Sequence, residues 1–133
     1  MTHEYTHAVI SMMTDNKCPV WLQEGIAVFE QSRYMPVALT YFKNTGRDEE
    51  KRLSINGLES GFLDVSNTEA LGASYEGSYT AVLFILDKWG WAGLKGMLQL
   101  IKEGQHYANA MDEEFYVSVK VFEDMWNEYI ANL

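Results

Sequence analysis

The sequence predicts an all-α fold, with residues 1–133 forming a single compact helical domain. Apolar residues recur every three or four positions through most of the chain, which is the spacing of one helix face. No segment alternates apolar and polar residues in the way that predicts a half-buried strand. Pro, Gly and Asn interrupt the apolar pattern at intervals that suit five to seven helices, and no repeat or linker divides the chain.

The composition also favours one folded domain. Of the 133 residues, 47% are hydrophobic and 14% aromatic, which is enough to build an apolar core. The formal net charge of -9 disfavours nucleic acid and anionic membranes as partners, because both are bound through clustered Lys and Arg. The most apolar stretch, residues 79–86, is too short for a membrane segment. Cys18 is the single cysteine, so an internal disulfide is excluded.

The first two helices are expected at residues 2–13 and 20–32. One apolar stripe runs along the first of them: Tyr5, Ala8, Val9 and Met12. Residues 14–19 are rich in turn formers and end this helix. Pro19 suits the beginning of the second helix, where a missing N–H group is tolerated.

The middle of the chain is expected to hold short helices and loops. Predicted helices cover residues 37–43 and 55–60, with a loop at residues 44–52 between them. Residues 64–74, DVSNTEALGAS, are expected to form an irregular surface loop, because small and turn-forming residues dominate them.

Four helices are expected in the C-terminal half, at residues 75–89, 91–103, 108–116 and 119–131. Gly90 and Gly104 end the first two, because glycine readily adopts the left-handed conformation of a helix C-cap. The Ser118 side chain can cap the last helix. That helix is expected to turn four large side chains inward: Phe122, Trp126, Tyr129 and Ile130.

A possible metal site stands in the first helix, where His3-Glu4-Tyr5-Thr6-His7 gives the pattern HExxH. Residues four apart share one helix face, so the two imidazoles of His3 and His7 can bind one zinc ion. Glu4 projects about 100° around the helix from His3. Its carboxylate therefore stands beside the metal, where a base can take a proton from metal-activated water.

A catalytic zinc ion usually has three protein ligands and one water, so a third side chain is needed. Glu24 is the best-placed candidate. A short turn lets the second helix fold back against the first, and Gly25 lets the two helices approach closely. His106, in a predicted surface loop, is the alternative that would close a purely structural site as a fourth ligand.

These residues carry a resemblance to a known family. HEYTH followed by WLQEGIAVFE resembles the gluzincin metallopeptidases, and most closely the peptidase MA-like group. The resemblance implies zinc-dependent hydrolysis of peptides or proteins, with zinc on His3, His7 and Glu24 and with Glu4 as the catalytic base. Three later segments are similar to segments of that family: LSINGLESGF, YEGSYTAVLFILDKWG and VFEDMWNEYI.

Two features depart from the pattern of the family. A β-sheet usually precedes the HExxH helix, and this chain has no residues for it, so we expect the C-terminal catalytic helical part of a longer domain. Val28 stands where some relatives carry an Asp that orients a histidine. The histidines need acceptors for their other ring nitrogens, and the sequence does not identify them.

A hydrogen-bond donor for a developing oxyanion is expected from the tyrosine-rich helix. Tyr75 and Tyr79 lie one turn apart at its start, and Tyr75 is preferred because it precedes the apolar run and can face a cleft. The favoured function is therefore a zinc peptidase. The alternative is a helical scaffold or binding module that keeps the fold, with or without zinc, and has no catalysis. In the simplest alternative, the polar residues of HExxH are only a solvated helix start.

Overall fold

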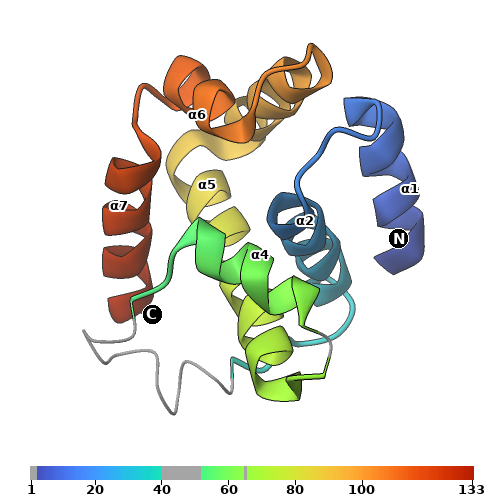
Figure 1. Cartoon of the computed structure of the whole chain (residues 1–133), viewed down its shortest axis with the longest axis vertical. Helices are drawn as coiled ribbons and strands as arrows, with labels where there is room; N and C mark the ends of the chain where they lie inside the picture. Colours follow the sequence, from blue (N-terminus) through green and yellow to red (C-terminus); the bar gives the residue numbers. More distant parts are fainter. Residues whose placement is uncertain (1–2, 40–51, 65) are drawn as a thin grey trace.

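The computed structural model describes residues 3–39, 52–64 and 66–133. In these ranges the chain forms six helices and no strand, which confirms the all-α prediction. With the labels of Figure 1, the helices are α1 (His3–Thr14), α2 (Val20–Ser32), α4 (Ile55–Leu63), α5 (Thr68–Lys102), α6 (Tyr107–Phe115) and α7 (Val119–Ala131). None of these helices combines the length and the apolar character that crossing a bilayer requires.

Helix α5 is the centre of the fold. It packs against each of the other five described helices, and α1 lies at one side of the molecule against α2 and α5 (Figure 1). The largest fully buried side chains come mostly from α2, α4, α5 and α7, and include Trp21, Leu22, Ile55, Ile85, Phe122 and Trp126. The side chains that α7 was expected to turn inward thus include two of the largest core residues.

Helix α1 does not place its most apolar stripe in the core. Its buried residues are Thr6, Ile10 and Thr14. Tyr5 is 58% exposed and Met12 is 80% exposed. The buried face is the one that continues from His3 and His7, because those residues precede Ile10 and Thr14 at helical spacing. The orientation of α1 therefore directs both imidazoles toward α2.

The beginning of α2 is held by another helix. It starts at Val20 as predicted, but its N-cap residue, Pro19, forms no side-chain hydrogen bond. Instead, Glu59 Oε1 on α4 accepts a hydrogen bond of 2.7 Å from the backbone N–H of Trp21. A carboxylate at a helix N-terminus also interacts favourably with the helix dipole. This contact fixes the first turn of α2, and Glu24 follows directly after that turn.

The prediction for residues 37–43 is only partly tested. Residues 37–39 are not helical, and the remainder lies outside the described residues, as does most of the loop expected at residues 44–52. Helix α4 begins at the predicted position and continues to Leu63 rather than ending at residue 60.

The surface loop expected at residues 64–74 is wrong over most of its length. Helix α5 begins at Thr68, and the Asn67 side chain caps it by accepting a hydrogen bond of 3.0 Å from Ala70 N. Ser74 is buried. A Cβ atom at Gly61 on α4 would collide with the Ser74 hydroxyl. Gly61 on α4 and the small side chain of Ser74 on α5 therefore allow the two helices to approach each other.

The predicted break at Gly90 is present. Gly90 has a φ of 71° and a ψ of -177°, so two helical segments meet at this residue within α5. Helix α6 agrees with its prediction to within one residue at each end. Helix α7 begins after Ser118, whose hydroxyl accepts a hydrogen bond of 3.2 Å from Val121 N, as expected.

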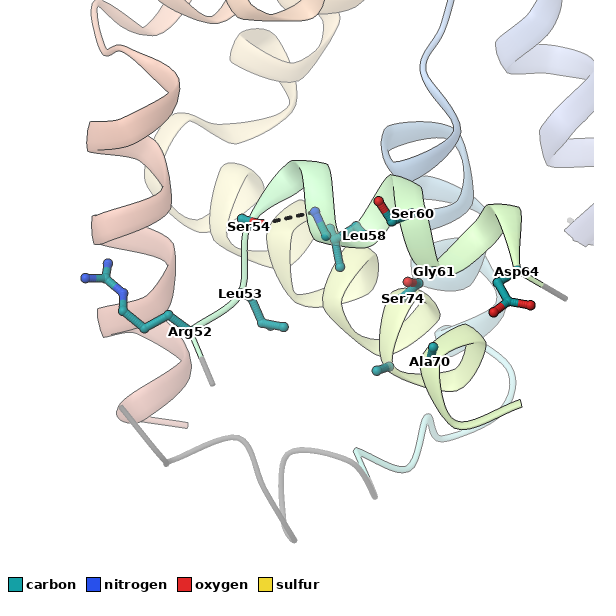
Figure 2. Close-up of a pocket in the computed structure, with 11 residues that line it drawn as sticks. Arg52, Leu53, Ser54, Leu58, Ser60, Gly61, Asp64, Ala70 and Ser74 are labelled. Atoms are coloured by element: carbon teal, nitrogen blue, oxygen red, sulfur yellow. Dashed lines mark hydrogen bonds between the residues drawn. The ribbon is translucent and has the colours of Figure 1, made fainter. Parts of the chain in front are cut away.

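A hollow of about 350 Å³ lies between α4, the segment before it and the start of α5. Figure 2 shows Arg52 and Asp64 at opposite ends of this hollow, with Leu58, Gly61 and Ser74 between them. Its lining includes none of the predicted site residues.

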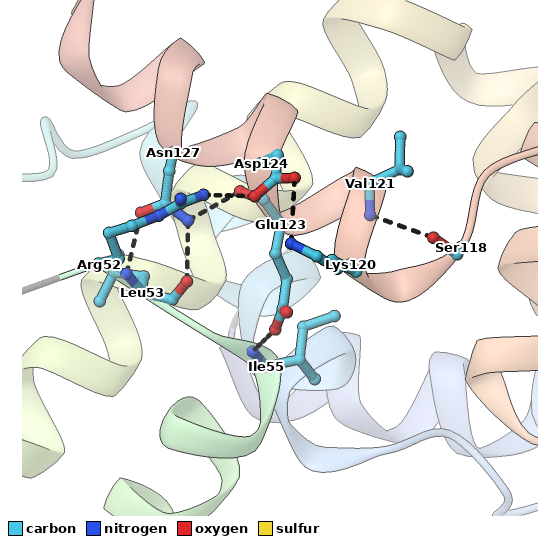
Figure 3. A network of polar contacts seen from close by, with 9 residues as sticks. All are labelled: Arg52, Leu53, Ile55, Ser118, Lys120, Val121, Glu123, Asp124 and Asn127. Atoms are coloured by element: carbon cyan, nitrogen blue, oxygen red, sulfur yellow. Dashed lines mark hydrogen bonds and ion pairs between the residues drawn. The ribbon is translucent and has the colours of Figure 1, made fainter.

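Polar contacts join α7 to the segment in front of α4 (Figure 3). Asn127 Oδ1 accepts a hydrogen bond of 2.9 Å from Leu53 N, and Asn127 Nδ2 donates one of 2.8 Å to Leu53 O. Glu123 Oε2 accepts a hydrogen bond of 2.7 Å from Ile55 N, the first residue of α4. The last helix therefore positions α4, and Glu59 of α4 positions α2.

Candidate metal centre

The turn between α1 and α2 brings the two helices together. Asp15 and Asn16 adopt left-handed conformations, with φ values of 55° and 60°. Asp and Asn tolerate this region better than most residues. Asn16 N donates a hydrogen bond of 2.8 Å to Ser11 O, which closes the end of α1. Pro19 then begins α2, which runs back antiparallel to α1 (Figure 1).

Three of the predicted site residues meet between these helices. His3 Nε2 lies 3.0 Å from His7 Nε2 and 3.1 Å from Glu24 Oε2. His7 Nε2 lies 3.2 Å from Glu24 Oε1. Over the residues that the structure describes, this is the only group of His, Cys, Asp and Glu side chains close enough together to hold a metal ion.

The geometry of this cluster fits zinc. Two ligand atoms at about 2.0–2.1 Å from a tetrahedral zinc ion are roughly 3.3 Å apart. The two imidazole nitrogens are 3.0 Å apart, and each has one Glu24 oxygen near it, Oε2 at 3.1 Å from His3 and Oε1 at 3.2 Å from His7. Two imidazole nitrogens and a carboxylate oxygen are among the ligands that zinc accepts. The side chains of His3, His7 and Glu24 remain 32%, 23% and 15% exposed, so one side of the cluster is open to water.

The structure places Glu4 outside the three-residue cluster. It lies in the first turn of α1, next to His3, and it is exposed. The helical turn directs its side chain about 100° away from that of His3.

The two candidate tyrosines of α5 have different neighbours. Partial burial, and secondarily the charge of Glu24, raise the pKa of Tyr75 above its usual value. The Tyr75 ring packs edge-on against Phe62, with the ring centroids 5.1 Å apart. Tyr79 instead interacts with Tyr129, whose pKa is raised mainly by burial and less by neighbouring charges. The charge of Glu24, a candidate metal ligand, thus acts on Tyr75, the preferred tyrosine.

Gly25 has a different role from the one expected. A Cβ atom at this position would collide with Ser78 O and lie 2.6 Å from Val82 Cγ2, both on α5. The glycine therefore allows α2 to approach α5 rather than α1, because it lies about 100° around the helix from Glu24.

Gln23 was not identified from the sequence. Its Oε1 atom lies 2.7 Å from His7 Nδ1, the ring nitrogen that faces away from the cluster. Its only signal in the sequence is its position directly before Glu24, in the first turn of a helix expected to face the histidines. His106 takes no part in the cluster, since its Nδ1 accepts a hydrogen bond of 3.1 Å from Ala108 N at the start of α6.

Comparison with known proteins gives one match. A family model described as Peptidase MA superfamily matches residues 1–132, which is almost the whole chain and includes α1, α2 and the turn between them. Searches of curated proteins and of solved structures give no match.

Proposed function

Because the chain belongs to the peptidase MA superfamily, we propose that it hydrolyses peptide bonds in peptide or protein substrates with the help of zinc. The observation that carries the proposal is the convergence of His3 Nε2 and His7 Nε2, 3.0 Å apart, on the carboxylate of Glu24, whose Oε2 lies 3.1 Å from His3 and whose Oε1 lies 3.2 Å from His7. Membership of the superfamily supports a peptidase in general, and the cluster supports a metal-dependent one.

In this proposal the residues of the site have different chemical roles. Bound zinc supplies a Lewis acid and lowers the pKa of a water molecule. Glu4 accepts a proton from the attacking water and delivers it to the nitrogen of the leaving amine. Tyr75 donates a hydrogen bond to the carbonyl oxygen as negative charge develops on it. The hydroxyl of Tyr75 is protonated at neutral pH, as a donor must be, because the ordinary pKa of tyrosine is about 10 and its surroundings raise the pKa of Tyr75 further.

Replacement of the proposed base tests the function. Untagged wild-type protein and Glu4→Gln are analysed for zinc content and for cleavage of a casein-type substrate. We expect about one zinc per chain in both, because Glu4 is not a ligand, and a rate reduced by about 10²–10⁴-fold in the variant. Glu69→Gln is a matched control, because Glu69 is also exposed in the first turn of a helix, and it should cleave as the wild type does.

Other outcomes would contradict parts of the proposal. Wild-type protein without zinc would remove the metal centre, and full activity in Glu4→Gln would remove the base. Zinc in the wild type without cleavage would favour the second candidate, a zinc-binding helical scaffold. Tyr5 and Met12 leave apolar side chains exposed on α1, which favours that candidate because exposed apolar side chains can contact a partner protein.

A further inference from the structure

We infer that Gln23 is a positioning residue that fixes the tautomer of His7 for zinc binding. This inference rests on the proposed zinc site and adds to it a residue that does not touch the metal. Gln23 Oε1 lies 2.7 Å from His7 Nδ1. On the other side of the same ring, His7 Nε2 lies 3.0 Å from His3 Nε2 and 3.2 Å from Glu24 Oε1.

The tautomer follows from the chemistry of the two partners. A neutral imidazole carries one proton, on either Nδ1 or Nε2, and an amide oxygen can only accept a hydrogen bond. His7 Nε2 also faces an acceptor, Glu24 Oε1, but at 3.2 Å, and the shorter contact of 2.7 Å with Gln23 Oε1 favours the proton of His7 on Nδ1. This leaves the Nε2 lone pair directed at the space that His3 and Glu24 share. The opposite tautomer would put a hydrogen atom where the metal must bind.

The fold holds Gln23 in this position. Gln23 ends the first turn of α2 and Glu24 follows it directly, and Glu59 fixes that turn through its hydrogen bond to Trp21 N. Gln23 is half-buried, which limits competition from water for its amide oxygen. Val28, one turn beyond Glu24, is apolar and offers no side-chain acceptor. One turn of α2 thus supplies both a ligand and the acceptor that orients another ligand.

The first test measures zinc affinity by competition with a chromogenic chelator at neutral pH. Gln23→Leu keeps the size of the side chain but removes the acceptor, and we expect zinc to bind about 10–100-fold more weakly, the usual loss when such a partner is removed. Gln23→Glu keeps an acceptor at the same position and should retain the affinity. Gln31→Leu makes the same change elsewhere on α2 and should leave the affinity within about 2-fold of the wild type.

The second test reads the tautomer directly, by two-bond ¹H–¹⁵N spectroscopy of the histidine rings in the metal-free protein. We expect His7 to carry its proton on Nδ1 in the wild type and in Gln23→Glu, and to lose this preference in Gln23→Leu. A proton on Nε2 in the wild type would overturn the inference, and so would equal zinc affinity in wild type and Gln23→Leu.

The two proposals can fail separately. Zinc binding by the wild type without cleavage would remove the peptidase function and leave the role of Gln23 standing. Cleavage by a zinc-loaded wild type, together with unchanged zinc affinity in Gln23→Leu, would remove only the role of Gln23. A wild type that binds no zinc would overturn both.

Discussion

The surroundings raise the pKa of both Tyr75 and Cys18, but only for Tyr75 is a candidate metal ligand, Glu24, among the causes. Burial, and secondarily the charge of Glu59, raise the pKa of Cys18 to about 12. Its thiol is therefore a packed side chain and not a nucleophile at neutral pH. Partial burial and, secondarily, the charge of Glu24 raise the pKa of Tyr75, so its hydroxyl remains protonated and able to donate a hydrogen bond.

Removal of the Tyr75 hydroxyl tests its proposed role. We expect Tyr75→Phe to lower kcat by about 10²-fold, the usual effect of losing one oxyanion donor, and to leave the zinc content unchanged. Tyr79→Phe removes the same group one turn away, on the side of Tyr129, and should retain wild-type kcat. Steady-state kinetics of the two variants make the comparison, and equal losses in both would contradict the assignment.

At the scale of a helix, the first two turns of α2 make contacts with three other helices. Glu59 from α4 caps its beginning, Glu24 faces α1, and Gly25 lies against the backbone of α5. The direction of Glu24 therefore depends on how closely α2 can approach α5. Space at Gly25 sets this distance, since even one methyl group there would meet Ser78 and Val82.

Addition of that methyl group tests the dependence. We expect Gly25→Ala to destabilise the protein by about 1–3 kcal/mol through overpacking, and to weaken zinc binding because Glu24 is displaced. Gly72→Ala is the matched control, because a Cβ atom at Gly72 in α5 would meet nothing within 4 Å. The control should be neutral or gain up to about 1 kcal/mol from helix propensity. Urea unfolding of the metal-free proteins measures the stability of the two variants. A similar change in stability for Gly25→Ala and Gly72→Ala would contradict the packing argument.

At the scale of the whole molecule, the two ends of the chain are linked through α4. Asn127 and Glu123 on α7 hold the backbone at Leu53 and Ile55, and α4 in turn caps α2 (Figure 3). The site at the N-terminal end thus rests on contacts made by the C-terminal helix. An ion pair of 2.6 Å between Arg52 and Asp124 lies beside this network, but both side chains are about half exposed.

Loss of the Asn127 side chain should therefore affect the whole fold. We expect Asn127→Ala to lower the free energy of unfolding by about 1–3 kcal/mol, because Leu53 N–H and C=O lose their partner in a half-buried position. Asn132→Ala, on an exposed residue at the end of the same helix, should change it by less than about 0.5 kcal/mol. Urea unfolding measures this difference, and equal effects would show that the network is not structural.

Local signals located most of the helices from the sequence alone. The HExxH spacing, Pro19 before α2, Gly90 within α5 and the Ser118 cap of α7 all act within one or two helical turns, and each agrees with the structure. The loop expected over residues 64–74 was wrong for a physical reason. Small residues favour turns when water surrounds them, but here Ser74 is buried against Gly61 of α4.

The sequence by itself determined that His3 and His7 share one helix face, and it indicated Glu24 as their companion, because helix geometry fixes side chains four residues apart. Tertiary structure alone decided that Gln23 contacts His7, that the charge of Glu24 acts on Tyr75, and that Tyr5 and Met12 stay exposed. These outcomes depend on how helices rotate and approach when they pack. Many side-chain contacts, made by residues far apart in the chain, set that packing together, and no short pattern encodes it.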